Sequence, residues 1–265
     1  MAGRVKIKDI EENIKEMEIN DALNHLYDLK LETGLSLDKL ISKYTKKKDL
    51  LDLEHARFNE MCKFEREAYS KGATFIAGVD EAGRGPLAGP VVAAAVILPE
   101  NIFIPKLNDS KKLSSKQRDE LYSIIMEKAI AYGVGMSDEK CIDEINILNA
   151  TKKAMEEAVL DLKPVPDFLL TDAVGLQNLK IPQWNIIGGD ALSTSIAAAS
   201  IIAKVTRDRI IEELDTVYPQ YGFAKHKGYG TKEHIDAIKK FGICPIHRMS
   251  FVKNFTGYKQ IMMDL

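Results

Sequence analysis

Two adjacent carboxylates, Asp80 and Glu81, directly follow an apolar run and precede a glycine-rich turn, Gly83-Arg84-Gly85. The apolar run, residues 74–79, has the composition of a buried strand. Acids that crowd together at the tip of such a strand tend to lose their charge unless a cation holds them. Oxygen ligands of this kind favour Mg²⁺ or Mn²⁺ over zinc. The stretch therefore predicts a hard-metal site beside a loop whose backbone a ligand can approach closely.

Two further acids, Asp172 and Asp190, each follow an apolar run of their own. If the strands that begin at Thr74 and Phe168 are parallel neighbours, their carboxyl ends bring the acids to one edge of a sheet, where ligands bind. Four carboxylates can hold two divalent ions about 3.5–4 Å apart, as in in-line phosphoryl transfer. Each acid alone would also fit a turn or a helix cap, and Asp190 could simply precede the helix near Ser193. The recurrence of acids after three apolar runs favours the metal site.

The elements that must position these acids differ between the two ends of the chain. Residues 1–71 carry Leu, Ile and Met at helical spacing among charges of both signs, which predicts an N-terminal helical extension ending in a long helix over about 48–70. Residues 72–265 begin with a hairpin-like series of strands and then alternate strands with helices. This order predicts an α/β domain around a mixed sheet, followed by a C-terminal helical segment. The expected strands are 74–79, 91–98, 131–136, 168–171 and 184–187, and the main helices are 116–130, 147–162 and 193–218.

Composition narrows the class of protein without identifying a partner. The 265 residues are 45% hydrophobic and 29% charged, with a net charge of −2, so a nucleic acid would have to be bound by a local basic surface. Residues 204–259 supply one, with 11 Lys and Arg against 6 Asp and Glu. Three scattered cysteines indicate neither disulfides nor a zinc site. With no apolar leader and no apolar run of membrane-spanning length, we expect a soluble cytoplasmic protein without a membrane partner.

Five separated motifs give the chain a specific resemblance. Asp80 to Val92 (Asp-Glu-Ala-Gly-Arg-Gly-Pro-Leu-Ala-Gly-Pro-Val-Val) resembles the signature of ribonuclease HII, the type 2 ribonuclease H family. Four further stretches, which resemble the same family in the same order, are residues 108–113, 189–191, 195–208 and 221–231. The match extends from about Phe75 to Phe251.

This resemblance implies a ribonuclease H-like fold, a mixed five-stranded sheet flanked by helices. It implies an endonuclease that cleaves RNA paired to DNA and incises 5′ of single ribonucleotides in duplex DNA, leaving a 3′-hydroxyl and a 5′-phosphate. Asp80, Glu81, Asp172 and Asp190 fall on the family's catalytic, metal-binding acids, with Mn²⁺ or Mg²⁺ as cofactor and two ions during catalysis. The alternatives are another ribonuclease H-fold nuclease, such as an exonuclease, and a non-catalytic module that binds hybrids.

Substrate contacts are expected around the same site. The glycine turn can approach a sugar and, by the resemblance, senses the 2′-hydroxyl that distinguishes RNA from DNA. Tyr229 would stack on the deoxynucleotide beyond the ribonucleotide. Lys225, Lys227 and Arg248 are further candidate phosphate contacts, whereas Arg207 could instead pair with Asp208 on the helix surface. The substrate-binding residues that we predict are Gly83, Arg84, Gly85, Asn108, Lys111, Lys112, Ser193, Lys204, Arg207 and Tyr229. The spacing of His226, His234 and His247 matches no ligand pair, so we expect them to have packing or positioning roles.

Overall fold

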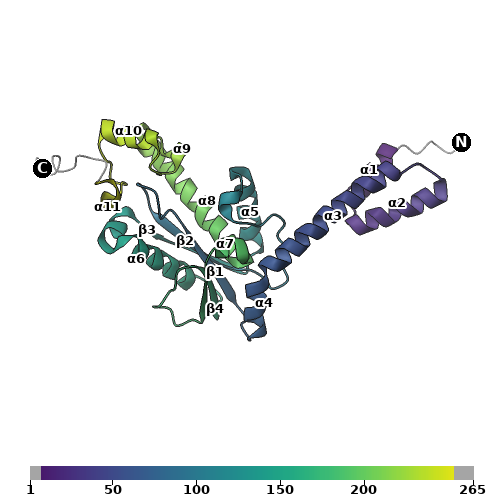
Figure 1. Cartoon of the computed structure of the whole chain (residues 1–265), viewed down its shortest axis with the longest axis horizontal. Coiled ribbons are helices and arrows are strands. Elements are labelled where there is room, and N and C mark those ends of the chain that lie inside the picture. The colour runs from purple at the N-terminus through teal and green to yellow at the C-terminus, as the bar shows by residue number, and fades with distance from the viewer. Residues whose placement is uncertain (1–6, 254–265) are drawn as a thin grey trace, which may run out of the picture. The chain divides into compact units, whose positions relative to one another are not determined.

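The computed structural model of the protein describes residues 7–253 (Figure 1), which belong to two compact units, Met1–Asn59 and Glu60–Leu265. The first unit contains α1 (Ile7–Ile14), α2 (Ile19–Thr33) and most of α3 (Asp38–Met61). Apolar residues at helical spacing, including Ile14, Leu26 and Leu37, are fully buried between these helices. The first unit therefore has a small helical core of its own.

The second unit is built on five strands. They are β1 (Ile76–Ala82), β2 (Val91–Ile97), β3 (Ala131–Ser137), β4 (Phe168–Asp172) and β5 (Gln183–Ile186). The strand order is β3-β2-β1-β4-β5, in which β1, β2 and β3 are antiparallel and β1, β4 and β5 are parallel. The mixed five-stranded sheet is thus confirmed, and the two acid-bearing strands β1 and β4 meet the condition of parallel pairing on which the convergence of the acids depended.

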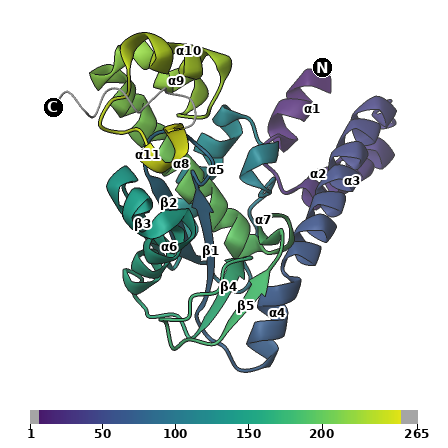
Figure 2. The ribbon, with the colours of Figure 1, turned by 60° about the vertical axis from the view of Figure 1, so that its left-hand side comes forward.

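The helices of the second unit are α4 (Lys63–Ser70), η1 (Ser110–Lys112), α5 (Ser115–Lys128), α6 (Glu139–Leu160), α7 (Gly189–Leu192), α8 (Thr194–Val217), η2 (Pro219–Tyr221), α9 (Phe223–His226), α10 (Lys232–Phe241) and α11 (Met249–Val252). Several of them flank the sheet, whereas α9 and α10 lie beyond it (Figure 2). Within the described residues, no helix is long and apolar enough to cross a bilayer.

The two faces of the sheet are covered by different helices. Ala77 and Val79 of β1 pack with Ala154 and Ala158 of α6 in one core cluster. The alternate residue Gly78 faces α8, where a Cβ atom would lie only 2.0 Å from the backbone of Ser195. Because side chains alternate between faces along a strand, even-numbered residues of β1 face α8. Glycine at position 78 thus allows α8 to lie directly against the strand that carries Asp80.

The end of the N-terminal segment differs from its sequence pattern. Instead of one helix over residues 48–70, the chain forms α3 and α4 with a break at Cys62. Helix α4 belongs to the second unit, where Ala68 packs with Ile76 and Leu170. The compact units therefore divide before α4, and the functional division into residues 1–71 and 72–265 stays a prediction.

Candidate active site

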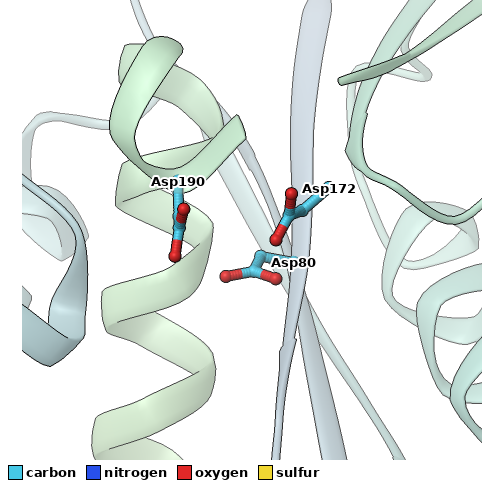
Figure 3. A group of neighbouring side chains, drawn as sticks. All are labelled: Asp80, Asp172 and Asp190. Carbon is cyan, nitrogen blue, oxygen red and sulfur yellow. The ribbon is translucent and has the colours of Figure 1, made fainter. Parts of the chain in front are cut away.

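Three carboxylates meet at the edge of the sheet where β1 and β4 end (Figure 3). Asp80 near the end of β1, Asp172 at the end of β4 and Asp190 in α7 each place one oxygen within 4.8 Å of the others. Asp80 and Asp172 share the α8-facing side of the sheet, and α7 leads directly into α8. Asp80 and Asp172 therefore project from the same face of the sheet, and the short connection between α7 and α8 brings Asp190 to that face. These two features explain why acids up to 110 positions apart (from 80 to 190) converge.

Glu81, the fourth predicted acid, has a different environment. It follows Asp80 on the strand and is not a member of the three-carboxylate group, since neighbouring side chains leave a strand on opposite sides. Burial and, to a smaller extent, the charge of Asp172 raise the pKa of Glu81, so its carboxylate is still within electrostatic reach of the cluster. Its Oε1 atom lies 3.3 Å from Nη1 of Arg84, while its Oε2 atom is buried without a hydrogen-bond partner. Glu81 therefore has one oxygen that the described protein groups leave unsatisfied.

The electrostatics of the cluster favour a bound cation. Burial, followed by the charge of Glu81, raises the pKa of Asp80 well above its ordinary value. Burial and the charge of Asp190 raise the pKa of Asp172, although a 2.9 Å hydrogen bond from the Gly189 amide acts in the opposite direction. Crowded acids, an orphaned buried carboxylate oxygen and an all-oxygen donor set fit a hard divalent ion.

Lys111 partly compensates the negative charge. Its Nζ atom lies 2.9 Å from Oδ2 of Asp190, and the hydrogen bond to this carboxylate raises the pKa of the lysine. The motif that carries Lys111 forms η1, whose first turn is capped by Asp109 through a 2.8 Å bond to the Lys111 amide. Asn108 is half-buried and Lys112 is exposed. Lys111, one of the predicted substrate contacts, is therefore in direct contact with a carboxylate of the cluster.

The glycine turn and the predicted stacking tyrosine lie side by side. Arg84 and Gly85 are exposed, whereas Gly83 is buried with a φ of +98° that only glycine adopts readily. A Cβ atom on Gly85 would lie 3.7 Å from Cε1 of Tyr229, whose side chain is 45% exposed. These residues thus form a continuous exposed surface next to the strand end that carries the acids.

Two of the predicted substrate contacts, Ser193 and Arg207, have buried side chains in this structure, and their role in substrate binding stays a prediction. Ser193 is fully buried and donates its hydroxyl to Glu65 at 2.6 Å, because it caps the start of α8. Arg207 is 1% exposed and donates to the carbonyl oxygens of Ala88, Pro90 and Lys227. Neither side chain is free to reach a phosphate, and Arg207 does not form the surface pair with Asp208 that was considered.

Arg248, the other candidate arginine, is also in the interior. It is completely buried and donates to main-chain carbonyl oxygens of the glycine turn. Burial lowers the pKa of Arg248 to about 9, which leaves it protonated at neutral pH. Sequence reasoning placed this residue on the surface because an arginine near the C-terminal basic segment is usually exposed.

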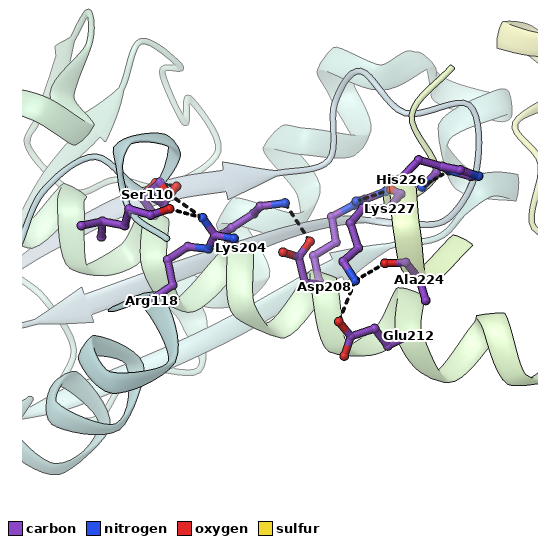
Figure 4. A network of polar contacts seen from close by, with 12 residues as sticks. Ser110, Arg118, Lys204, Asp208, Glu212, Ala224, His226 and Lys227 are labelled. Atoms are coloured by element: carbon purple, nitrogen blue, oxygen red, sulfur yellow. Dashed lines mark hydrogen bonds and ion pairs between the residues drawn. The ribbon is translucent and has the colours of Figure 1, made fainter. Parts of the chain in front are cut away.

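Other predicted cations line a surface pocket of about 430 Å³ formed by residues of α5, α8 and α9, and Figure 4 shows the polar contacts of several of them. Lys204 is paired with Asp208 at 2.7 Å, and Lys227 is paired with Glu212 at 2.6 Å. A phosphate that approaches these lysines must therefore compete with the carboxylates of Asp208 and Glu212 on α8. The pocket is lined by Ser115, Arg118, Asp119, Lys204, Val205, Asp208, Arg209, Glu212, Lys225 and Lys227.

The histidines have the packing role that their spacing indicated. His226, His234 and His247 are buried, and the rings of His226 and His234 stack with centroids 4.5 Å apart. The Nε2 atoms of His234 and His247 lie 3.1 Å apart. Burial lowers the pKa of both His234 and His247 to about 4, so both are neutral at pH 7.

Sequence reasoning missed the buried carboxylate of Glu65. Its Oε1 atom accepts hydrogen bonds from the Ser193 hydroxyl, the Thr194 hydroxyl and the Ser195 amide. This places a negative charge at the positive N-terminus of α8. Residues 63–70 have the charged, amphipathic pattern of a surface helix, and nothing in that pattern indicated that Glu65 would be buried.

Clustered carboxylates at the end of parallel strands in a mixed sheet define the class of ribonuclease H-like nucleases, and comparisons with known proteins specify the family. The sequence profile described as Ribonuclease HII matches residues 77–254. A relative named Ribonuclease HII from Acetivibrio thermocellus is 61% identical over 253 residues, which cover 96% of this chain and 99% of the relative. A relative of the same name from Clostridioides difficile is 50% identical and covers 94% of this chain and 97% of its own. The chain therefore belongs to the ribonuclease HII family.

The fold comparison agrees with this assignment. The crystal structure of the ribonuclease H2 from Pyrococcus horikoshii superimposes with a TM-score of 0.58 at 30% identity. It covers 67% of this chain and 94% of its own. The protein is thus an enzyme, an endonuclease of the ribonuclease H class.

Proposed function

We propose that this chain cuts the RNA strand of RNA–DNA hybrids and incises duplex DNA 5′ of a single embedded ribonucleotide. The products would carry a 3′-hydroxyl and a 5′-phosphate. The observation that carries the proposal is the convergence of Asp80, Asp172 and Asp190 within 4.8 Å, in the family in which these motifs occur. The exposed Gly85 and Tyr229, which lie against each other, would contact the sugars on the two sides of the junction.

Asp80, Asp172 and Asp190 would hold Mg²⁺ or Mn²⁺, and the unsatisfied Oε2 atom of Glu81 offers a further ligand. Two such ions, when bound, supply an activated water and stabilise the charge that develops on the leaving oxygen. The protein's own contribution is to keep these carboxylates close together despite their mutual repulsion. Lys111 reduces that repulsion through its contact with Asp190.

The glycine turn would recognise the ribose. Gly85 is exposed and has no side chain, so a sugar can approach its main-chain groups directly. A site built to hydrogen-bond a hydroxyl rejects analogues that lack it, so we expect steep discrimination against all-DNA duplexes. Tyr229 would stack on the deoxynucleotide 3′ of the ribonucleotide and favour DNA at that position.

Cations around the site would contact the phosphates. Lys111 and Lys112 precede α5, while Lys204, Lys225 and Lys227 line the pocket on α8 and α9. Because Lys204 and Lys227 are paired with acids, we expect each to contribute modestly and with strong salt dependence.

The test is incision of an end-labelled duplex that carries one ribonucleotide, in the presence of Mg²⁺ or Mn²⁺. We expect one internal nick on the 5′ side of the ribonucleotide, far slower cutting of the matched all-DNA duplex, and loss of activity in Asp80→Asn. Release of mononucleotides from an end would show an exonuclease instead. Binding without turnover would show a hybrid-binding module, and equal cutting of the all-DNA duplex would refute recognition of the 2′-hydroxyl.

A further inference from the structure

His247 and Arg248 are adjacent, almost completely buried residues, one linked through His234 to Tyr229 and the other bonded directly to the glycine turn. Arg248 donates from Nη2 to the Gly83 carbonyl at 2.6 Å and from Nη1 to the Arg84 and Pro86 carbonyls at 3.0 and 2.9 Å. Its Nε atom donates to the Gly89 carbonyl at 2.9 Å. One guanidinium thus makes four hydrogen bonds to main-chain carbonyls, two of them in the glycine turn and two in the segment that follows it.

The direction of these bonds determines what the turn presents to a ligand. In a planar trans peptide, the N–H points away from the carbonyl that precedes it. Because the carbonyls of Gly83 and Arg84 point inward to Arg248, the N–H groups of Arg84 and Gly85 point away from it. Among the described residues, neither N–H has a protein acceptor. Arg248 therefore leaves a pair of free donors at the exposed part of the turn.

The neighbouring His247 is connected to Tyr229 through a second histidine. The Tyr229 carbonyl lies 2.9 Å from Nδ1 of His234, so this nitrogen carries the proton and donates. Nδ1 of His247 accepts from the Cys244 amide at 2.9 Å, so its Nε2 carries the proton and donates to Nε2 of His234 at 3.1 Å. The hydrogen bonds therefore run in one direction, from Cys244 through both imidazoles to the backbone of Tyr229.

We propose that His247 and Arg248 are positioning residues that set the geometry between the glycine turn and Tyr229, and thereby the selectivity for a single ribonucleotide followed by DNA. This inference rests on the proposed function. Since the two residues are adjacent and anchored by the same backbone segment, the donors of the turn and the carbonyl of Tyr229 are held relative to one another. His247 and Arg248, which within the described part of the chain make no hydrogen bond to a carboxylate of the cluster, would thus control which substrate is cut.

The first experiment uses a matched pair of substitutions at His247. Asparagine can replace Nδ1 as acceptor for the Cys244 amide but does not reach His234, whereas glutamine places an amide donor near the position of Nε2. The measured quantity is kcat/KM for a duplex with one ribonucleotide, divided by kcat/KM for a continuous RNA–DNA hybrid. We expect His247→Asn to lower this ratio by roughly tenfold, the effect of one lost hydrogen bond, and His247→Gln to stay within about twofold of the wild type.

A double-mutant cycle with Tyr229→Ala tests whether the effect passes through the tyrosine. In the Tyr229→Ala background, His247→Asn should leave the ratio unchanged. If His247→Asn does not fold, His234→Gln takes its place, because glutamine at position 234 cannot donate to the Tyr229 carbonyl. His234→Asn is then the control, since its side-chain amide can still donate to that carbonyl. A ratio that stays at the wild-type value in His247→Asn or His234→Gln, or an equal loss in both backgrounds, would overturn the role of the histidines.

The second experiment addresses Arg248. Lysine keeps the charge but cannot reach four carbonyls, so Arg248→Lys should reduce discrimination between the single-ribonucleotide duplex and the all-DNA duplex by about tenfold. Unchanged discrimination, with any loss of rate common to all substrates, would show that Arg248 only stabilises the fold. Wild-type protein that incises nothing would refute the proposed function and this inference with it, whereas normal wild-type incision with unchanged ratios in the variants refutes the inference alone.

Discussion

Lys111 and Asp190 form a 2.9 Å ion pair in which the carboxylate is buried and most of the lysine side chain is exposed. The lysine therefore supplies a positive charge from the surface to a cluster of acids inside. Its ammonium group occupies the neighbourhood that a divalent cation would share.

Replacement of Lys111 by glutamine should separate metal affinity from substrate affinity. Loss of the ammonium group leaves Asp190 more available, so Mn²⁺ affinity should rise by a few fold, while the KM for a single-ribonucleotide duplex rises because a phosphate contact is lost. Calorimetric titration with Mn²⁺ and steady-state kinetics measure the two effects. Lys112→Gln, at the exposed neighbour, is the control and should change KM alone; weaker Mn²⁺ binding in Lys111→Gln would contradict the compensation by Lys111.

Replacement of Asp80 by asparagine should remove activity while increasing stability. Burial, followed by repulsion from Glu81 and Asp172, raises the pKa of Asp80, so removal of its charge should stabilise metal-free protein by roughly 1 kcal/mol. Urea unfolding in EDTA and an incision assay test the two halves. Asp167→Asn is the control with the opposite expected effect on stability. Asp167 accepts hydrogen bonds from the amides of Thr74 and Phe75 and is not one of the clustered carboxylates.

Asp167→Asn should therefore lose stability, by about 1–2 kcal/mol for weakened charge-assisted bonds, and keep its activity per folded molecule. If Asp80→Asn is the less stable of the two variants in EDTA, the repulsion that we describe does not dominate at the site.

Replacement of Glu65 by alanine should destabilise the second unit. The change removes the acceptor for two hydroxyls and one amide at the start of α8, which should lower the free energy of unfolding by about 2–4 kcal/mol. Glu67→Ala is the matched control on the same helix, since the exposed Glu67–Lys71 pair should contribute less than about 0.5 kcal/mol. Chemical denaturation measures both, and similar midpoints for the two variants would count against the buried cap.

The histidine pair should make stability fall in mild acid. Folding lowers the pKa of His234 and His247 from 6.5 to about 4, so between these values the unfolded chain binds more protons than the folded one. Their contribution is fully present above pH 6.5 and is lost as the pH falls towards 4. The limit is on the order of 3 kcal/mol for one such histidine.

Urea denaturation at pH 7.5 and pH 4.5 measures this loss. His234→Asn should show a smaller decrease in stability between the two pH values than the wild type, because the variant has one proton-binding group fewer to expose. His25→Asn, at an exposed position in the first unit, should keep the wild-type decrease. A decrease that is the same in all three proteins would assign the acid sensitivity to other groups.

The sequence predicted a cluster of four acids because strand ends are visible as apolar runs that stop at a carboxylate, and the structure groups three of them. That prediction was conditional on parallel pairing of β1 and β4, which the structure shows. The place of Glu81 follows from strand parity, which requires the strand boundaries to be known to one residue. Sequence patterns locate those boundaries only approximately.

Buried arginines and acids were beyond the reach of sequence reasoning. Arg207, Arg248 and Glu65 have the residue types of a solvated surface, and only their main-chain and hydroxyl partners in three dimensions explain why they are inside. The same holds for Ser193, which has a structural partner in Glu65. The contacts that these residues make join segments that are distant in the chain, so no local pattern could have indicated them.

Gly78 makes the spacing of the proposed reaction centre depend on a missing methyl group. Even alanine at this position would collide with the first turn of α8 and force the helix outward. Because Asp190 is carried immediately before that turn, the displacement would draw it away from Asp80. Gly78 has no functional group, but it sets the distance between the carboxylates of Asp80 and Asp190. We therefore expect substitutions at position 78 to be tolerated poorly, although the residue takes no part in the reaction.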